Sequence, residues 1–120
     1  MDERPILVVE DDPSILEAIA TLFELKGYDV LTARDGAEAL RLMERRMPRL
    51  VVLDMLLPRV NGWEFTYQLR ALGIHVPVLV MTALNDPEYC ATEVGAAGFV
   101  AKPFEVGELL QQVEHMQRAA

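Results

Sequence analysis

The chain has 120 residues, 52% of them hydrophobic, and a formal net charge of −8, which indicates one globular domain over residues 1–120 and excludes a disordered chain. So acidic a chain is a poor candidate for binding nucleic acid or an anionic membrane through its net field. Its single cysteine excludes an internal disulfide framework and agrees with a cytoplasmic location, and no apolar run approaches the roughly 18 residues that span a bilayer.

The first part of the chain alternates short apolar runs with stretches of helical spacing. Residues 6–9 predict a strand, and Pro13 suits the first turn of a helix that Gly27 ends. A more polar strand is predicted over residues 28–32, which places it nearer an edge of the sheet. The second helix is expected to begin at Asp35, which a glutamate follows three residues later as in a capping pair.

The middle of the chain begins with a third predicted strand. Residues 50–53 are all apolar, and like the predicted first and fourth strands they have the continuous apolar character of strands that are covered on both faces. A loop marked by Asn-Gly follows, and then a third helix with Phe65, Leu69 and Leu72 on one face.

The last part of the chain repeats the alternation twice. Residues 76–81 predict a fourth strand, Pro87 opens a short helix, and residues 98–101 predict a fifth strand. The apolar stripe of a last helix consists of Val106, Leu109, Leu110, Val113 and Met116. Five alternations of strand and helix predict an α/β domain with a parallel sheet and helices on both faces.

Polar side chains stand where the predicted strands end. Glu10 and Asp11 follow the first strand, Asp54 the third, Thr82 the fourth and Lys102 the fifth. The carboxyl ends of parallel strands share one edge, where open α/β sheets place their sites. Two carboxylates about 4 Å apart repel by roughly 4 kcal/mol at an effective dielectric of 20, so the cluster needs a proton or a cation. Mg²⁺ with oxygen ligands meets this need, and metal, ammonium and hydroxyl together suit a phosphoryl group transferred to an aspartate.

Four motifs in order resemble the receiver domains of two-component response regulators. They are residues 6–13, 53–58 with Gly62, 81–83 and 102–104, and the resemblance covers almost the whole chain. It implies a flavodoxin-like, doubly wound five-stranded parallel sheet of order 2-1-3-4-5 with five helices, in a single domain.

The resemblance also implies roles for the acidic residues. Asp54 would be the phosphoryl acceptor in a Mg²⁺-dependent reaction. Asp11 would ligate Mg²⁺ directly, Glu10 would act largely through metal-bound water, and the backbone carbonyl of Leu56 would complete the protein's ligands. The phosphoryl donor would be a phosphohistidine on a histidine kinase or a phosphotransfer protein.

The remaining roles implied by the resemblance concern the switch. Lys102 would pair with Asp54 at rest and with the phosphoryl oxygens afterwards. The Thr82 hydroxyl would be drawn to the phosphoryl group, and Phe99 matches the aromatic residue that then turns inward. The face formed by the fourth helix, fifth strand and fifth helix would control a downstream partner or effector domain. We expect no direct nucleic-acid or membrane binding by this domain. Phosphorylation-dependent dimerisation is an alternative that the resemblance leaves open. The paired basic and acidic residues through which DNA-binding relatives dimerise are not evident.

Two features depart from the family pattern. The stretch from Thr82 to Gly95 is about two residues shorter than usual, roughly half a helical turn, so we expect a contraction next to the output face. Leucines also stand at Leu56 and Leu84, two positions after Asp54 and Thr82. Our hypothesis is that these leucines keep water from an aspartyl phosphate and slow its hydrolysis.

Each candidate residue also has a plainer interpretation. Asp54 alone would be a turn former or a helix cap, and Asp12 is expected to cap the first helix rather than to bind metal. Thr82 alone is an ordinary strand end, and Lys102 before a proline is an ordinary turn residue. The functional interpretation depends on all the motifs occurring together.

Three rival functions stay open. A metal-dependent phosphohydrolase with Asp54 as nucleophile usually carries a second acid where this chain has Leu56. A flavodoxin-like cofactor binder needs a phosphate loop after the first strand, where the acidic residues 10–12 would repel phosphate. A degenerate receiver that only binds a partner would not need the full set of polar residues. We expect a signalling phosphoacceptor that catalyses only its own phosphorylation and dephosphorylation.

Overall fold

Five parallel strands form one sheet in the order β2-β1-β3-β4-β5, which confirms the predicted fold class. The strands are β1 (Ile6–Val9), β2 (Val30–Ala33), β3 (Leu50–Asp54), β4 (Val78–Thr82) and β5 (Gly98–Ala101). The helices are α1 (Pro13–Leu25), α2 (Gly36–Arg45), α3 (Gly62–Ala71), α4 (Pro87–Glu93) and α5 (Val106–Ala119). The computed structural model describes residues 2–119, so the predicted domain limits at Met1 and Ala120 lie outside the described residues.

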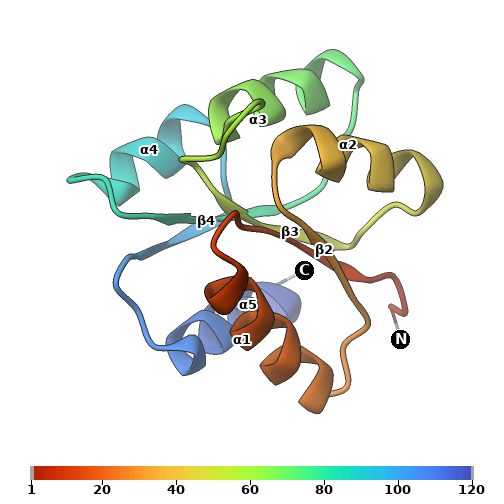
Figure 1. The fold of residues 1–120 in the computed structure, drawn as a ribbon, viewed down its shortest axis with the longest axis vertical. Helices are drawn as coiled ribbons and strands as arrows, with labels where there is room; N and C mark the ends of the chain where they lie inside the picture. Colours follow the sequence, from red (N-terminus) through yellow and green to blue (C-terminus); the bar gives the residue numbers. More distant parts are fainter. Residues whose placement is uncertain (1, 120) are drawn as a thin grey trace.

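The helices cover both faces of the sheet (Figure 1). Helices α2, α3 and α4 lie on one face and pack with it into one buried apolar cluster. Helices α1 and α5 lie on the other face and form a second cluster. Every residue of β1, β3 and β4 is buried, which confirms the prediction that these strands are covered on both sides. No helix within residues 2–119 combines the length and the apolar character needed to cross a membrane.

The local sequence sets the start of helix α1, which follows strand β1. The Asp12 carboxylate accepts hydrogen bonds from the backbone N–H groups of Ser14 and Ile15, which confirms Asp12 as the N-cap. Pro13 occupies the first turn, where its missing N–H costs nothing. The buried face of α1 consists of Leu16, Ile19 and Phe23.

The predicted start of the second strand was wrong by two residues. Strand β2 begins at Val30, which pairs with Ile6 of β1, and it runs to Ala33. Tyr28 belongs to the connection instead, because its ring packs edge-on against Phe23 at 6.1 Å between centroids and lies under the Arg49 guanidinium at 4.8 Å. Strand β2 is nevertheless at the edge of the sheet, as its polar character indicated.

Two expectations about the second half also needed correction. Strand β4 begins at Val78 rather than at residue 76, and Pro77 precedes it. The Pro77 carbonyl still accepts a bond from the N–H of Val51, so the residue lies beside β3. Leu72 is 67% exposed rather than on the buried face of α3, because the helix ends at Ala71 and the chain turns away.

The loop between β3 and α3 is held closely to its surroundings. The N–H of Gly62 donates to the carbonyl of Met55 at 3.0 Å, so the two ends of the loop are joined. A Cβ atom at Gly62 would lie 2.7 Å from the Cα of Met55, and one at Gly36 would lie 2.6 Å from the carbonyl oxygen of Val60. Only glycine permits these approaches.

We expect Gly62→Ala to lower the free energy of unfolding by about 1–3 kcal/mol, because the added methyl group meets backbone atoms that cannot move aside. Chemical denaturation would measure the change. Gly107→Ala is the matched control, since a Cβ there has no neighbour within 4 Å and a helical alanine gains up to about 1 kcal/mol over glycine. Equal stability of Gly62→Ala and the wild type would contradict this account of the loop.

Candidate functional site

The carboxyl ends of four strands bring the predicted polar residues to one edge of the sheet. Asp54 and Thr82 are the last residues of β3 and β4, and Glu10 and Lys102 directly follow β1 and β5. Backbone pairing continues past the strands, because the N–H of Lys102 donates to the carbonyl of Thr82 at 2.8 Å. The strands therefore fix the positions from which these side chains start.

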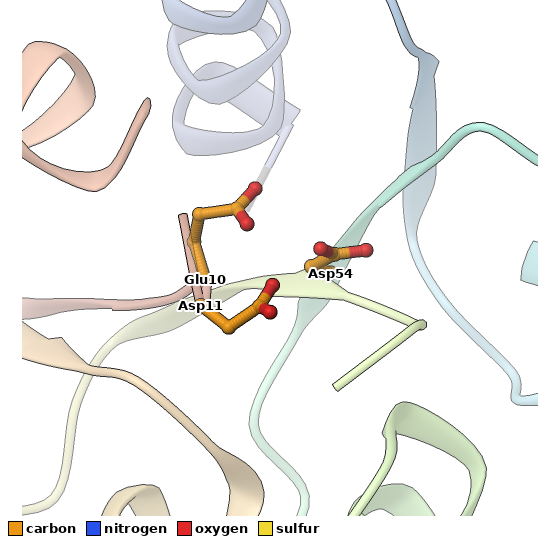
Figure 2. A group of neighbouring side chains, drawn as sticks. All are labelled: Glu10, Asp11 and Asp54. Atoms are coloured by element: carbon orange, nitrogen blue, oxygen red, sulfur yellow. The ribbon is translucent and has the colours of Figure 1, made fainter. Parts of the chain in front are cut away.

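Three carboxylates converge at this edge (Figure 2). Glu10, Asp11 and Asp54 each place a carboxylate oxygen so that the three atoms lie within 4.8 Å of one another. Glu10 and Asp54 are buried, and Asp11 is exposed. In Figure 2 the Asp11 side chain, which belongs to the loop after β1, extends toward Asp54 at the end of β3. The cluster of acidic residues that the sequence predicted is thus present as a compact group.

Lys102 supplies the positive charge for two of the three carboxylates. Its Nζ atom donates to Glu10 Oε1 at 2.7 Å and to Asp54 Oδ2 at 3.0 Å. The contact with Asp54 was expected, but the shorter contact with Glu10 was not. Among the described residues, the exposed carboxylate of Asp11 has no ion pair.

The environment of Lys102 favours its charged form. Burial lowers the pKa of an ammonium group, but here the hydrogen bonds that Lys102 donates to Glu10 and Asp54, together with the negative charges of these carboxylates, outweigh it. The pKa of Lys102 is therefore raised above its ordinary value, and the side chain stays cationic at neutral pH. One cation facing three carboxylates still leaves the group with excess negative charge.

Backbone donors orient the two buried carboxylates. The N–H of Leu56 donates to Asp54 Oδ1 at 3.2 Å, and the N–H of Asp12 donates to Glu10 Oε2 at 3.1 Å. With Lys102 on the other oxygen in each case, each buried carboxylate has a donor on both oxygens. These bonds reduce the cost of burying the two charges.

Thr82 and Phe99 lie on neighbouring strands beside the cluster. Thr82 is fully buried, and its hydroxyl oxygen accepts a bond from the N–H of Leu84 at 3.1 Å. Phe99 lies on β5 and is partly exposed. Leu56 and Leu84 are exposed over 52% and 37% of their surfaces, so both flank the site without being buried in it.

A second layer of charged residues was missed by sequence reasoning. Asp35 was predicted only as a helix cap, and its carboxylate does accept from the N–H of Glu38 at 2.8 Å. It also pairs with Arg59, whose Nε donates to Asp35 Oδ2 at 2.9 Å. In a full capping pair the Glu38 carboxylate would accept a hydrogen bond from the N–H of Asp35. Here it accepts from the N–H of Arg34 instead, one residue earlier in the chain.

The pKa of Asp35 is lowered below its ordinary value. The N–H of Glu38 is the largest cause, burial opposes it, and the guanidinium of Arg59 lowers it further. No sequence signal identified Arg59, because its partner is 24 residues away and on a different loop.

The donor set at the sheet edge fits a hard divalent cation. All three carboxylates offer oxygen atoms, which are the ligands that Mg²⁺ prefers. Mg²⁺ sites in proteins often use only one or two carboxylates, and water molecules fill the remaining positions. Asp11 is the carboxylate most open to an incoming ion, because it is exposed while Lys102 holds the other two.

Helix α4 contains only seven residues, Pro87–Glu93, and is the shortest of the helices in the described chain. Pro87 lies in its first turn, as predicted, and Asp86 is its N-cap and accepts from the N–H of Tyr89 at 2.9 Å. The short stretch after Thr82 is therefore occupied by a two-turn helix.

Comparison with known proteins gives a consistent result. The chain matches the model of the response regulator receiver domain family over residues 6–114. It is 40% identical over 118 residues to the alkaline phosphatase synthesis transcriptional regulatory protein PhoP of Bacillus subtilis, covering 96% of this chain and 49% of that protein. It is 38% identical over 115 residues to the response regulator MprA of a Mycobacterium species, covering 94% and 50%.

A solved structure agrees with these matches. The receiver domain of the Francisella response regulator 1452 superposes with a TM-score of 0.88 at 32% identity, covering 98% of this chain and 99% of that one. The chain spans about half the length of the curated relatives it matches.

We expect Asp11→Asn to raise the free energy of unfolding without metal by roughly 0.5–1 kcal/mol, because it removes one unpaired charge from an acidic group. Adding Mg²⁺ should raise the melting temperature of the wild type but not of this variant. Differential scanning calorimetry would measure both effects.

The control for this experiment is Asp12→Asn, which removes the same charge one residue away from an exposed cap position. It should keep the response to Mg²⁺. A full response to Mg²⁺ in Asp11→Asn would remove Asp11 from the metal site.

Proposed function

Because the chain belongs to the response regulator receiver domain family, we propose that it accepts a phosphoryl group on Asp54 from a partner histidine kinase or phosphotransfer protein. The observation that carries the proposal is the buried Asp54 carboxylate, bound to Lys102 at the same sheet edge as Glu10 and Asp11. A helix cap would need neither the lysine nor the two further carboxylates.

The transfer moves one phosphoryl group between two side chains. An oxygen of the Asp54 carboxylate attacks the phosphorus of the donor phosphohistidine, and the phosphorus–nitrogen bond breaks. The bonding electron pair leaves with the imidazole nitrogen, and the product is an aspartyl phosphate. The Leu56 N–H on Oδ1 and Lys102 on Oδ2 orient the attacking carboxylate.

The acidic residues are proposed to hold Mg²⁺. Asp11 and Asp54 would ligate it directly with the backbone carbonyl of Leu56, and Glu10 would act through bound water. When bound, Mg²⁺ would neutralise charge on the phosphoryl oxygens.

Lys102 and Thr82 are proposed to respond to the phosphoryl group. Lys102 can move its ammonium from the Asp54 carboxylate to a phosphoryl oxygen, which carries more charge. The Thr82 hydroxyl, which accepts from Leu84 at rest, can donate its own proton to a phosphoryl oxygen. Movement of Thr82 would open space beside β5 for the partly exposed ring of Phe99.

The output is proposed to be a population shift of the face formed by α4, β5 and α5, because one local charge event there would favour one of two packings. Relatives named as transcriptional regulators are about twice as long as this chain. An effector domain or separate partner would therefore read the switched face, and the net charge of −8 argues against direct nucleic-acid binding by this domain. The proposed location is the cytoplasm.

Incubation with Mg²⁺ and acetyl phosphate should add one phosphoryl group to the wild type and none to Asp54→Asn, because an amide oxygen is a poor nucleophile. A phosphate-sensitive gel would show the difference. Asp86→Asn, the same change at the N-cap of α4, should be labelled like the wild type. Equal labelling of Asp54→Asn would remove Asp54 as the acceptor.

The lifetime of the aspartyl phosphate should be shorter in Leu84→Glu than in the wild type. A carboxylate at this exposed position would draw water toward the acyl phosphate, whereas the leucine is proposed to exclude water. We expect a several-fold difference, measured as loss of labelled phosphate after the donor is removed. A wild-type lifetime equal to or shorter than that of the variant would exclude the shielding role of Leu84.

A further inference from the structure

The turn between β2 and α2 contacts both loops that carry the acidic cluster. Arg34 donates from Nη2 to the backbone carbonyl of Asp11 at 3.2 Å, which reaches the loop after β1. The Asp35 carboxylate pairs with Arg59, and the N–H of Gly36 donates to the carbonyl of Val60 at 3.1 Å, which reaches the loop after β3. Three consecutive residues of one turn therefore join the two loops.

The contact between Asp35 and Arg59 is the one of these links that joins two opposite charges. Asp35 is only 2% exposed, so its charge depends on the donors around it. Arg59 lies at the surface but uses both Nε and Nη2 on the same carboxylate oxygen. Without Arg59, the buried carboxylate would keep only backbone donors.

The backbone of Arg59 shows that this contact holds the loop in an uncommon conformation. Its φ is +62°, in the left-handed region that side chains with a Cβ rarely adopt. The side-chain pair with Asp35 and the bond from Gly36 to the next residue, Val60, keep the chain there. A glycine at this position would accept the backbone conformation but could not make the pair.

Only a short segment of the loop is left between these anchors. The loop is closed at its ends by the bond between Met55 and Gly62 and is held at Arg59 and Val60 by the turn. The segment between them contains Leu56, whose N–H already orients the Asp54 carboxylate. A displacement at Arg59 would therefore be passed to Leu56 and from there to Asp54.

We propose that the β2–α2 turn, through the Asp35–Arg59 pair, sets the distance between the loop of Asp11 and the loop of Asp54 and Leu56, and so determines the affinity of the acidic cluster for Mg²⁺. Arg59 and Asp35 are positioning residues, since neither belongs to the proposed ligands. The inference rests on the proposed Mg²⁺ site.

The sign of the effect separates this role from simple electrostatics. Removing an arginine near a cation site removes repulsion, so Coulomb's law alone predicts tighter Mg²⁺ binding. Loss of the Asp35–Arg59 pair predicts weaker Mg²⁺ binding, because the ligands are no longer held at the right spacing. Changes to residues that orient metal ligands typically cost 10–100-fold in affinity.

The test is a calorimetric titration of the purified chain with MgCl₂, well below the unfolding temperature. We expect Arg59→Gly to raise the Kd for Mg²⁺ by about tenfold, and Arg59→Lys to recover part of the affinity by restoring one charged donor. The control is Arg46→Ala, which removes an arginine from the exposed ion pair with Asp29 and changes the net charge equally. It should bind Mg²⁺ as the wild type does or slightly more tightly.

A second variant covers the case in which Arg59→Gly does not fold. Arg59→Gln keeps a long side chain at this position but removes the guanidinium that pairs with Asp35, and it should also weaken Mg²⁺ binding although it removes a positive charge. Mg²⁺ affinity equal to or higher than that of the wild type, in whichever of the two variants is folded, would overturn the inference. A wild type that does not bind Mg²⁺ would instead refute the proposed metal site, and the inference with it.

Discussion

The ammonium group of Lys102, held between the carboxylates of Glu10 and Asp54, is the interaction on which the site depends. Both carboxylates are buried, and burying a carboxylate is costly unless it meets a cation and hydrogen-bond donors, as both do here. Because Lys102 follows β5 while its partners lie at the ends of β1 and β3, the contact requires that these strands and the intervening β4 are assembled in one sheet. The site therefore depends on the fold of this part of the sheet.

The charges at this edge of the sheet do not balance. One cation faces three carboxylates, and Asp11 has no ion pair within the described residues. Such a group is less stable than a fully paired one, and under the proposed function a divalent cation would supply the missing positive charge. Packing and helix capping elsewhere in the molecule offset this loss of stability. Two apolar layers cover the sheet, and carboxylate caps fix the starts of α1, α2 and α4.

Most of the fold could be predicted from local pattern. The continuous apolar strands, the proline and aspartate signals at helix starts and the alternation of elements led to the observed topology. The errors lie at boundaries. Tyr28 was assigned to a strand, although its ring packs on Phe23 and under Arg49, and Leu72 was assigned to a buried face beyond the end of α3. In both places a tertiary contact or a chain turn overrides the pattern of hydrophobic residues.

The residues that gather at the sheet edge can be identified from the order of strands and polar residues in the chain, because residues that follow parallel strands must share that edge whatever the details of packing. This reasoning identifies Glu10, Asp11, Asp54, Thr82 and Lys102. Three contacts become visible only in the folded chain: Lys102 also binds Glu10, Arg59 adopts a left-handed backbone and pairs with Asp35, and Arg34 reaches the carbonyl of Asp11. These contacts join loops far apart in the chain, and hydrophobic periodicity and turn signals carry no information about them.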